Sequence, residues 1–381
     1  MSRHQRSHDY LQQYLVEEMV EEYQEAHISR RELVRQVLLI TGSIPATASL
    51  LLAAGCGSAA TPAAPASVPT TPAAAPTTVV TGSAPTTSAA TAAPITGTTT
   101  GTVATAATTA PPGATSGATS PSPGAAGTRP AVSAAAPAAS GGVTVSESDP
   151  AIDAGNVDLP GQAGMLKGYR ATPRGGAKAP GILVIHENRG LTEHIKDMTR
   201  RYAKAGYLAV AVDLVSRQGG TDKYPDASQV TGILGQANKA DLLQDLMSGV
   251  TYLKSLPMFA GPKAGAVGYC FGGGLTWALA TQSPDLAAAI PYYGPPPQPI
   301  EDVRKITAAV LAFYGETDQR ITSNEPAIEA AMKQYGKTFE FKIYPGAGHA
   351  FNNDTGQSYN AAAAKDAYQR SLDWFAKYLK V

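Results

Sequence analysis

The sequence carries almost no charge over a long internal stretch. Between residues 57 and 146 the only charged side chain is Arg129, and nearly all other residues are Ala, Thr, Pro, Ser or Gly. Such a segment has too little large apolar surface to offset the entropy lost on ordering it. A collagen-like structure is disfavoured because glycine does not recur at every third position. We therefore expect a disordered linker over residues 57–145 and one folded domain over residues 146–381.

Net charge and cysteine are also scarce. The 30 basic and 30 acidic side chains balance, and no basic run marks the folded part, so nucleic-acid binding is not expected. Only Cys56 and Cys270 are present, and without a C-x-x-C pair a thiol redox enzyme is disfavoured. If Cys56 is removed or modified, Cys270 has no intramolecular disulfide partner. It is then either a buried inert thiol or a thiol kept for chemistry. We expect no cofactor.

Residues 29–56 have the pattern of an export signal. The segment S-R-R-E-L at residues 29–33 precedes an apolar stretch and small residues that end at Cys56. This resembles a twin-arginine signal over residues 1–56, with a lipobox that makes Cys56 the lipidation site. The alternative is an uncleaved membrane anchor over residues 36–55. Both interpretations place the folded domain outside the cytoplasm of a bacterial cell, held at the membrane by its N-terminus.

An amphipathic pattern precedes this signal. Apolar side chains recur at helical spacing over residues 9–27, with glutamates between them. We expect a helix there, and a contact with a chaperone or translocase is one role for it. The apolar positions are Tyr10, Leu11, Tyr14, Leu15, Met19 and Tyr23.

The folded part alternates apolar runs with helical patterns. Runs of this kind that are apolar throughout predict parallel strands covered by helices on both faces, so the fold class is α/β. The expected strands are residues 181–187, 207–214, 264–270, 287–294, 308–315 and 339–346, and the expected helices are 191–206, 227–256 (one or two), 272–283, 324–335 and 359–379. Function in such sheets collects where the strands end.

The segment G-Y-C-F-G-G at residues 268–273 lies between an expected strand and an expected helix. Its form is that of a nucleophile elbow with cysteine in place of serine, and the turn is too sharp for side chains at Gly268 and Gly272. The helix start favours a thiolate at Cys270, and the N–H of Phe271 points toward a developing oxyanion. The alternative is a buried cysteine on a glycine-rich turn.

Two later residues favour the catalytic interpretation. Asp318 and His349 each follow an expected strand, and His349 is the only histidine after Cys270. The order nucleophile, acid, histidine is that of the α/β-hydrolase triad, in which histidine takes the proton and aspartate orients it. Zinc is not expected, because Gly190 occupies the second histidine position of an H-E-x-x-H motif in "HENRG".

The motifs "HENRGL", "DLVSRQGG", "GYCFGGG", "YGETDQRI" and "GAGHAF" together resemble the dienelactone hydrolase family over about residues 160–381. The resemblance implies an α/β-hydrolase fold, a Cys270–His349–Asp318 triad, and a carboxylate, Glu187, that holds the thiol until substrate arrives. It also implies the N–H of Asn188 as the second oxyanion donor.

The chain departs from the family pattern at the substrate carboxylate. The resemblance implies two arginines there; one matches Arg217, but Asn353 occupies the position of the other. Arg189 is a candidate replacement, or alternatively a salt-bridge partner of Glu187. For Arg217 the alternative is a surface arginine near Asp222 or Asp226.

We therefore expect an exported hydrolase that cleaves a small-molecule ester or lactone, dienelactone itself being one candidate substrate. The alternative is a non-catalytic surface- or carbohydrate-binding module on a stalk. The sequence assigns no oligomeric state.

Overall fold

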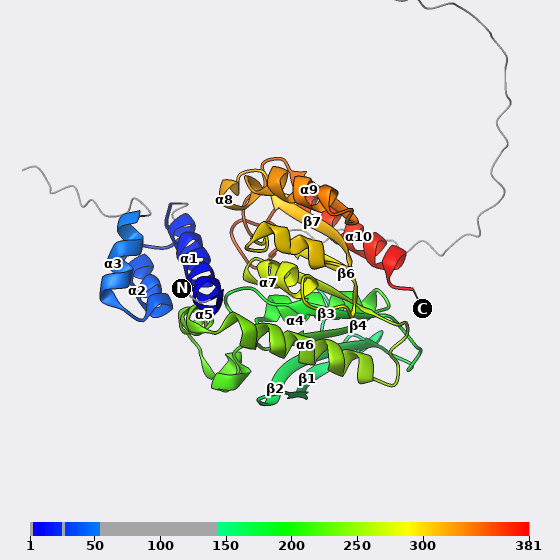
Figure 1. Ribbon diagram of the computed structural model, residues 1–381. Helices are drawn as coiled ribbons and strands as arrows, with labels where there is room; N and C mark the ends of the chain where they lie inside the picture. Colours follow the sequence, from blue (N-terminus) through cyan, green and yellow to red (C-terminus); the bar gives the residue numbers. More distant parts are fainter. Residues whose placement is uncertain (1–2, 25–26, 54–143, 381) are drawn as a thin grey trace, which may run out of the picture. The chain divides into compact units, whose positions relative to one another are not determined.

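The computed structural model describes residues 3–24, 27–53 and 144–380. Cys56 and nearly all of the expected linker lie outside these residues. One eight-stranded sheet has the order β1-β2-β4-β3-β5-β6-β7-β8 (Figure 1). The strands are β1 (Ile152–Gly161), β2 (Gly164–Pro173), β3 (Gly181–Ile185), β4 (Leu208–Val212), β5 (Ala264–Tyr269), β6 (Leu286–Tyr292), β7 (Ala309–Gly315) and β8 (Phe339–Tyr344).

The sheet is parallel from β4 to β8, as the sequence predicts. β1 and β2 add an antiparallel hairpin at one edge, which the sequence analysis did not predict. Every residue of β3, β4, β5 and β7 is buried, which explains their uninterrupted apolar runs.

Helices cover both faces of the sheet. Gly249 of α6 lies so close to Leu183 of β3 that a Cβ atom would come within 2.9 Å of it. A Cβ atom at Gly265 of β5 would likewise come within 2.6 Å of the Phe375 side chain of α10. Leu183 pairs with Ala266, the neighbour of Gly265, and successive side chains in a strand point to opposite faces, so α6 and α10 cover opposite faces. The helices of the domain are α4 (Glu193–Lys204), α5 (Ala227–Gln236), α6 (Lys239–Ser255), α7 (Phe271–Ala280), α8 (Gln319–Thr322), α9 (Glu325–Gln334) and α10 (Ala361–Tyr378), with short 3-10 turns at Ser216–Gln218, Thr221–Lys223 and Ile300–Lys305.

In the described residues before the domain there are three helices: α1 (Arg3–Gln24), α2 (Arg30–Thr41) and α3 (Ile44–Ala53). Gly42 has φ 63°, which ends α2 and splits the apolar stretch of the expected signal into two short helices. No helix in the described part of the chain is long and apolar enough to cross a membrane.

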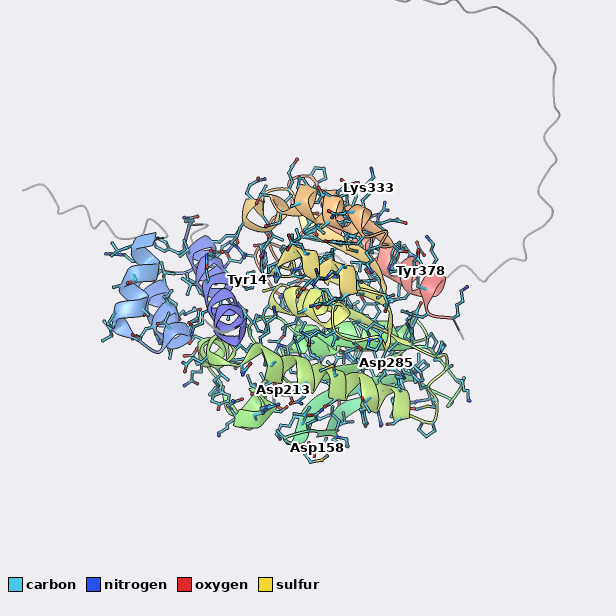
Figure 2. The ribbon with its side chains drawn as sticks, viewed as in Figure 1. Tyr14, Asp158, Asp213, Asp285, Lys333 and Tyr378 are labelled. Carbon is cyan, nitrogen blue, oxygen red and sulfur yellow. The ribbon has the colours of Figure 1, made fainter. Side chains whose placement is uncertain are left out.

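These N-terminal helices belong to the same compact unit as the domain. α2 packs on α5, where a Cβ atom at Gly235 would come within 2.6 Å of the Ile40 side chain. On α1, the predicted apolar stripe is buried at Tyr14, Leu15 and Met19. Tyr14 lies on the side of α1 that faces the domain (Figure 2). The amphipathic N-terminal helix therefore buries its apolar face within this chain.

Candidate active site

Cys270 lies on a strained turn between β5 and α7. Its backbone has φ 55° and ψ −119°, a conformation that non-glycine residues rarely adopt and that is concentrated at functional sites. A Cβ atom at Gly268 would come within 2.2 Å of the Gly272 carbonyl oxygen, and one at Gly272 within 2.4 Å of the Ile185 carbonyl oxygen. The prediction that this turn requires its glycines is confirmed.

Asp318 and His349 meet beside this turn. Asp318 follows β7, His349 follows β8, and His349 Nδ1 lies 2.6 Å from Asp318 Oδ2. Because Nδ1 is hydrogen-bonded to the Asp318 carboxylate, Nε2 is the ring nitrogen that remains to exchange a proton. Nε2 has no hydrogen-bond partner among the described residues. A ring nitrogen of His349 lies within 4.8 Å of Cys270 Sγ. The structure thus brings together the three side chains that the sequence predicts as a triad.

Burial and charge set the protonation of these groups. Burial favours neutral His349, but the Asp318 carboxylate outweighs it and raises the pKa of His349 well above its ordinary value. Burial likewise opposes ionisation of Asp318, yet its contact with His349 leaves the pKa of Asp318 lowered. Burial first, and then the negative charge of Glu18, raise the pKa of Cys270 to about 12. The nucleophile candidate is therefore a neutral thiol in this structure.

The carboxylate that contacts the thiol is Glu18 rather than Glu187. Cys270 Sγ donates to Glu18 Oε1 at 3.1 Å. Glu187 lines the same cavity, but its Oε2 accepts from the amide of Asn353 at 2.8 Å, and its Oε1 is buried without a partner among the described residues. Asn353, at the expected arginine position, therefore orients Glu187.

The two expected oxyanion donors lie at loop and helix starts beside the thiol. Phe271 is the first residue of α7, so its N–H belongs to the first turn, where backbone donors lack partners within the helix. Asn188 is buried and lines the cavity, and its carbonyl accepts from Thr231 Oγ1 at 3.1 Å, which fixes the loop after β3. The oxyanion role of both N–H groups stays a prediction.

Arg217 is bound to a carboxylate of α6. Its Nε and Nη2 donate to the two oxygens of Asp245, at 3.0 and 2.8 Å, and Asp245 is almost fully buried. The sequence analysis did not predict this partner, and Arg217 is not among the residues that line the cavity. Arg189 also has a partner that was not predicted, because it donates to Glu22 of α1 at 3.0 Å rather than to Glu187.

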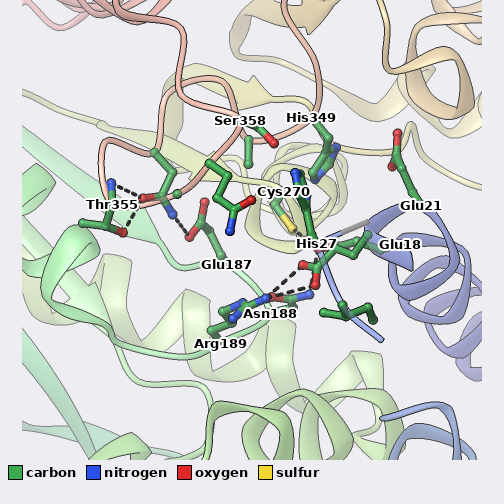
Figure 3. A pocket seen from close by; sticks show the side chains of 16 residues that line it. Glu18, Glu21, His27, Glu187, Asn188, Arg189, Cys270, His349, Thr355 and Ser358 are labelled. Atoms are coloured by element: carbon green, nitrogen blue, oxygen red, sulfur yellow. Dashed lines mark hydrogen bonds and ion pairs between the residues drawn. The ribbon is translucent and has the colours of Figure 1, made fainter. Parts of the chain in front are cut away.

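The side chains that α1 brings to the site were not predicted from the sequence. Figure 3 shows Glu18 and Glu21 beside Cys270 and His349, reaching in from the helix at one side of the cavity. Glutamates at helical spacing were visible in the sequence, but the pattern says only that one face of a helix is buried, not what it is buried against.

The cavity has a volume of about 350 Å³. It is lined by α1 and the two residues 27–28 that follow it, by the loop after β3, by Cys270 and His349, and by Asn353 and residues 355–358. Two groups of side chains lie close enough to share a metal ion: Glu18 with Cys270 and His349, and Glu21 with Asp318 and His349. His349 Nδ1 is already hydrogen-bonded to Asp318 in both groups, and this pairing of a histidine with a carboxylate suits proton transfer.

Residues 166–379 match the family model described as the dienelactone hydrolase family. A protein of Methylorubrum extorquens named carboxymethylenebutenolidase is 35% identical over 246 residues, covering 62% of this chain and 84% of that protein. A protein of Escherichia coli strain K12 with the same name is 34% identical over 263 residues, covering 64% and 94%. A crystal structure from Klebsiella pneumoniae, named as a dienelactone hydrolase, is 34% identical, with a TM-score of 0.56.

The Klebsiella pneumoniae structure also bears on which part of the chain folds by itself. It is covered over its whole length by 60% of this chain. All eight strands here lie between Ile152 and Tyr344, so no strand comes from the N-terminal helices. A chain that starts at Gly142 therefore contains a complete domain, and it serves below as the form without α1.

Proposed function

Because this chain belongs to the dienelactone hydrolase family, we propose that it cleaves its substrate with Cys270 as nucleophile, His349 as base and Asp318 as the group that orients the base. The family and the relatives make the chain a hydrolase of esters or lactones, rather than a non-catalytic binding module. The observation that carries the assignment is the 2.6 Å contact of His349 with Asp318, beside a cysteine on a strained strand–helix turn.

In this mechanism His349 Nε2 takes the thiol proton, and the thiolate of Cys270 attacks the substrate carbonyl. The N–H groups of Phe271 and Asn188 stabilise the oxyanion. The imidazolium, stabilised by the Asp318 carboxylate, returns the proton to the leaving alkoxide, and a thioester remains on Cys270. His349 then takes a proton from water, which attacks the thioester and releases the carboxylic acid and the free thiol.

In this proposal, Glu187 protects the Cys270 thiol from oxidation before substrate binds. Its Oε1 is buried without a hydrogen-bond partner among the described residues, so it is available to accept from the thiol when Glu18 is absent. A neutral thiol that is hydrogen-bonded to a carboxylate resists oxidation until substrate displaces the carboxylate.

The direct test uses the chain that starts at Gly142 and p-nitrophenyl acetate. Cys270→Ala should abolish hydrolysis and leave the melting temperature near that of the wild type, because the smaller side chain fits the turn. Cys270→Ser should lose most activity, because a hydroxyl needs a stronger base arrangement than a thiol. An active Cys270→Ala enzyme would refute the nucleophile assignment.

We further propose that residues 1–56 direct export and that Cys56 is lipidated. Support comes from the twin-arginine motif and from the positions of Arg30 and Arg31, which are exposed at the start of α2. Replacing both arginines by lysine should leave the precursor in the cytoplasm. Cys56→Ala should move the domain to the soluble fraction of the cell envelope, whereas continued membrane retention would favour an uncleaved anchor.

A further inference from the structure

The helix α1 places a carboxylate directly on the proposed nucleophile. Glu18 Oε1 accepts from Cys270 Sγ at 3.1 Å and from the side-chain amide of Asn188 at 2.7 Å. The hydroxyl of Tyr14, one helical turn earlier, lies 3.6 Å from the same sulfur atom. Glu18 and Cys270 are both buried. The carboxylate of Glu18 therefore lies beside the thiol, where a substrate carbonyl must approach.

The next acidic residues of α1 contact two arginines of the domain. Glu21 Oε2 accepts from Arg320 Nη2 at 3.0 Å, and Glu22 Oε1 accepts from Arg189 Nη2 at 3.0 Å. Arg189 lines the catalytic cavity, and Arg320 Nη2 lies 3.5 Å from His349 Nδ1. Two cationic groups thus lie beside the catalytic residues, and each is occupied by a carboxylate from one helix.

The two positions that the resemblance assigns to a substrate carboxylate, Arg217 and Asn353, are engaged within the domain. Arg217 is held by both oxygens of Asp245, and the amide of Asn353 donates to Glu187. The carboxylate partner of Arg189, by contrast, is Glu22 of α1, upstream of the expected cleavage point at Cys56. The same holds for the carboxylate partner of Arg320, Glu21.

The occupancy by α1 has a local cost. Glu18 Oε2 is buried without a hydrogen-bond partner among the described residues, and burial raises the pKa of Glu18. The helix stays in place through its buried stripe, which includes Leu15 and Met19, and through its ion pairs with Arg189 and Arg320. Weakening those ion pairs should therefore release it.

We propose that α1 is an internal inhibitor of this active site: its Glu18 covers the Cys270 thiol, and its ion pairs with Arg189 and Arg320 hold the helix there until the segment before Cys56 is removed. The proposal rests on the proposed function of Cys270. It also gives the chain a physical means of staying inactive before export, because the contacts that block the thiol belong to the segment that signal cleavage would remove.

The inhibitory part is tested in the full chain carrying Cys56→Ala, so that Cys270 is the only thiol. Glu21→Lys reverses the charge that faces Arg320. It should accelerate both the alkylation of Cys270 by iodoacetamide and the hydrolysis of p-nitrophenyl acetate, each by on the order of ten- to a hundredfold. The matched control is Glu17→Lys, one turn earlier on the same helix, where the carboxylate accepts from Gln13 of α1 itself. The control should stay within about twofold of the parent.

The two readouts separate this proposal from the proposed function. Faster alkylation without any hydrolysis would keep α1 as the inhibitor but refute the hydrolytic role of Cys270. Equal rates of Cys270 alkylation in the parent, in Glu21→Lys and in the chain starting at Gly142 would overturn the inhibitory role of α1, whatever the hydrolysis rate.

The contacts that hold α1 are tested separately, in the chain that starts at Gly142 and with Arg189→Gln and Arg320→Gln. A synthetic peptide of residues 3–24 should inhibit the parent competitively and inhibit both variants more weakly. The control is Arg174→Gln, which removes an exposed arginine paired with Asp153 on β1. A peptide that does not inhibit the parent, or that inhibits both variants as strongly as the parent, would overturn the inhibitory role of these contacts.

Discussion

Replacing Asp318 by asparagine should inactivate the enzyme without unfolding it. Asp318 is fully buried, and its Oδ2 lies 2.6 Å from His349 Nδ1. Asparagine has the same shape, so the packing is kept. Its amide group has no negative charge to stabilise the imidazolium, and it can donate to Nδ1. That contact would put the ring proton on Nε2, the nitrogen that must accept from Cys270.

The expected loss can be bounded from these two effects. A hydrogen bond to a charged group contributes about 1.5–3 kcal/mol, so losing the charge alone lowers kcat/KM by roughly ten- to a hundred-and-sixtyfold. A triad whose histidine holds the wrong tautomer loses up to about 10⁴-fold. We therefore expect kcat/KM to fall by between about 10² and 10⁴, with little change in the melting temperature.

The assay is hydrolysis of p-nitrophenyl acetate by the chain starting at Gly142, measured across pH. Asp318 is the main group that raises the pKa of His349. The pKa of His349 should therefore fall in Asp318→Asn, and the rising limb of the pH profile should move to lower pH. If the variant keeps more than about a tenth of wild-type activity with an unmoved limb, our assignment of Asp318 is wrong.

Three further variants follow from contacts outside the triad. Asp354 accepts from His194 at 3.0 Å, and although burial opposes it, this contact helps to lower the pKa of Asp354 to about 2. Asp354→Asn should therefore lower the free energy of unfolding by about 1 kcal/mol at pH 7, after discounting for partial exposure. Because the folded pKa of Asp354 is depressed, this contribution is present above about pH 4 and is lost as the pH falls through 2. Urea unfolding should therefore separate the variant from the wild type at pH 7 but not at pH 2. Arg217→Ala removes the partner of buried Asp245, so it should lower the melting temperature. It should also reduce kcat/KM equally on neutral and on carboxylate-bearing esters. A tenfold larger loss on the acidic ester would instead show that Arg217 binds the substrate carboxylate. Gly272→Ala forces a Cβ atom against the carbonyl oxygens of Ile185 and His186 at the end of β3. It should destabilise the domain by about 1–3 kcal/mol, measured by thermal unfolding. An unchanged melting temperature would show that the turn can relax.

The sequence was most informative where local patterns determine local structure. The strands β3 to β8 were predicted within a few residues, because each is an apolar run bounded by turn residues. The turn at Cys270 was predicted because its glycines follow from the steric demands of a sharp strand–helix connection. The β1–β2 hairpin escaped prediction because β1 (I-D-A-G-N-V-D-L-P-G) lacks the β-branched alternation that marks a strand.

The contacts that could not be predicted from the sequence all join segments that lie far apart along the chain. Glu18 meets Cys270 across 252 positions, and Arg217 meets Asp245 across 28. Periodicity gives the buried face of α1, but no local rule gives the surface against which that face packs. The expected hydrogen bond from the thiol to Glu187 is replaced here by one to Glu18, because α1 brings a second carboxylate to the same sulfur atom.

The most direct measurement of the central claim is to trap the covalent intermediate. The chain starting at Gly142 is mixed with p-nitrophenyl acetate, quenched in acid within milliseconds and digested for mass spectrometry. We predict an acetyl group on the peptide that contains Cys270. It should form together with a burst of p-nitrophenol, decay as turnover proceeds, and be absent from Cys270→Ala. Steady hydrolysis with no acetyl group on Cys270 at any time, or with the acetyl group on another residue that turns over at the catalytic rate, would contradict the account.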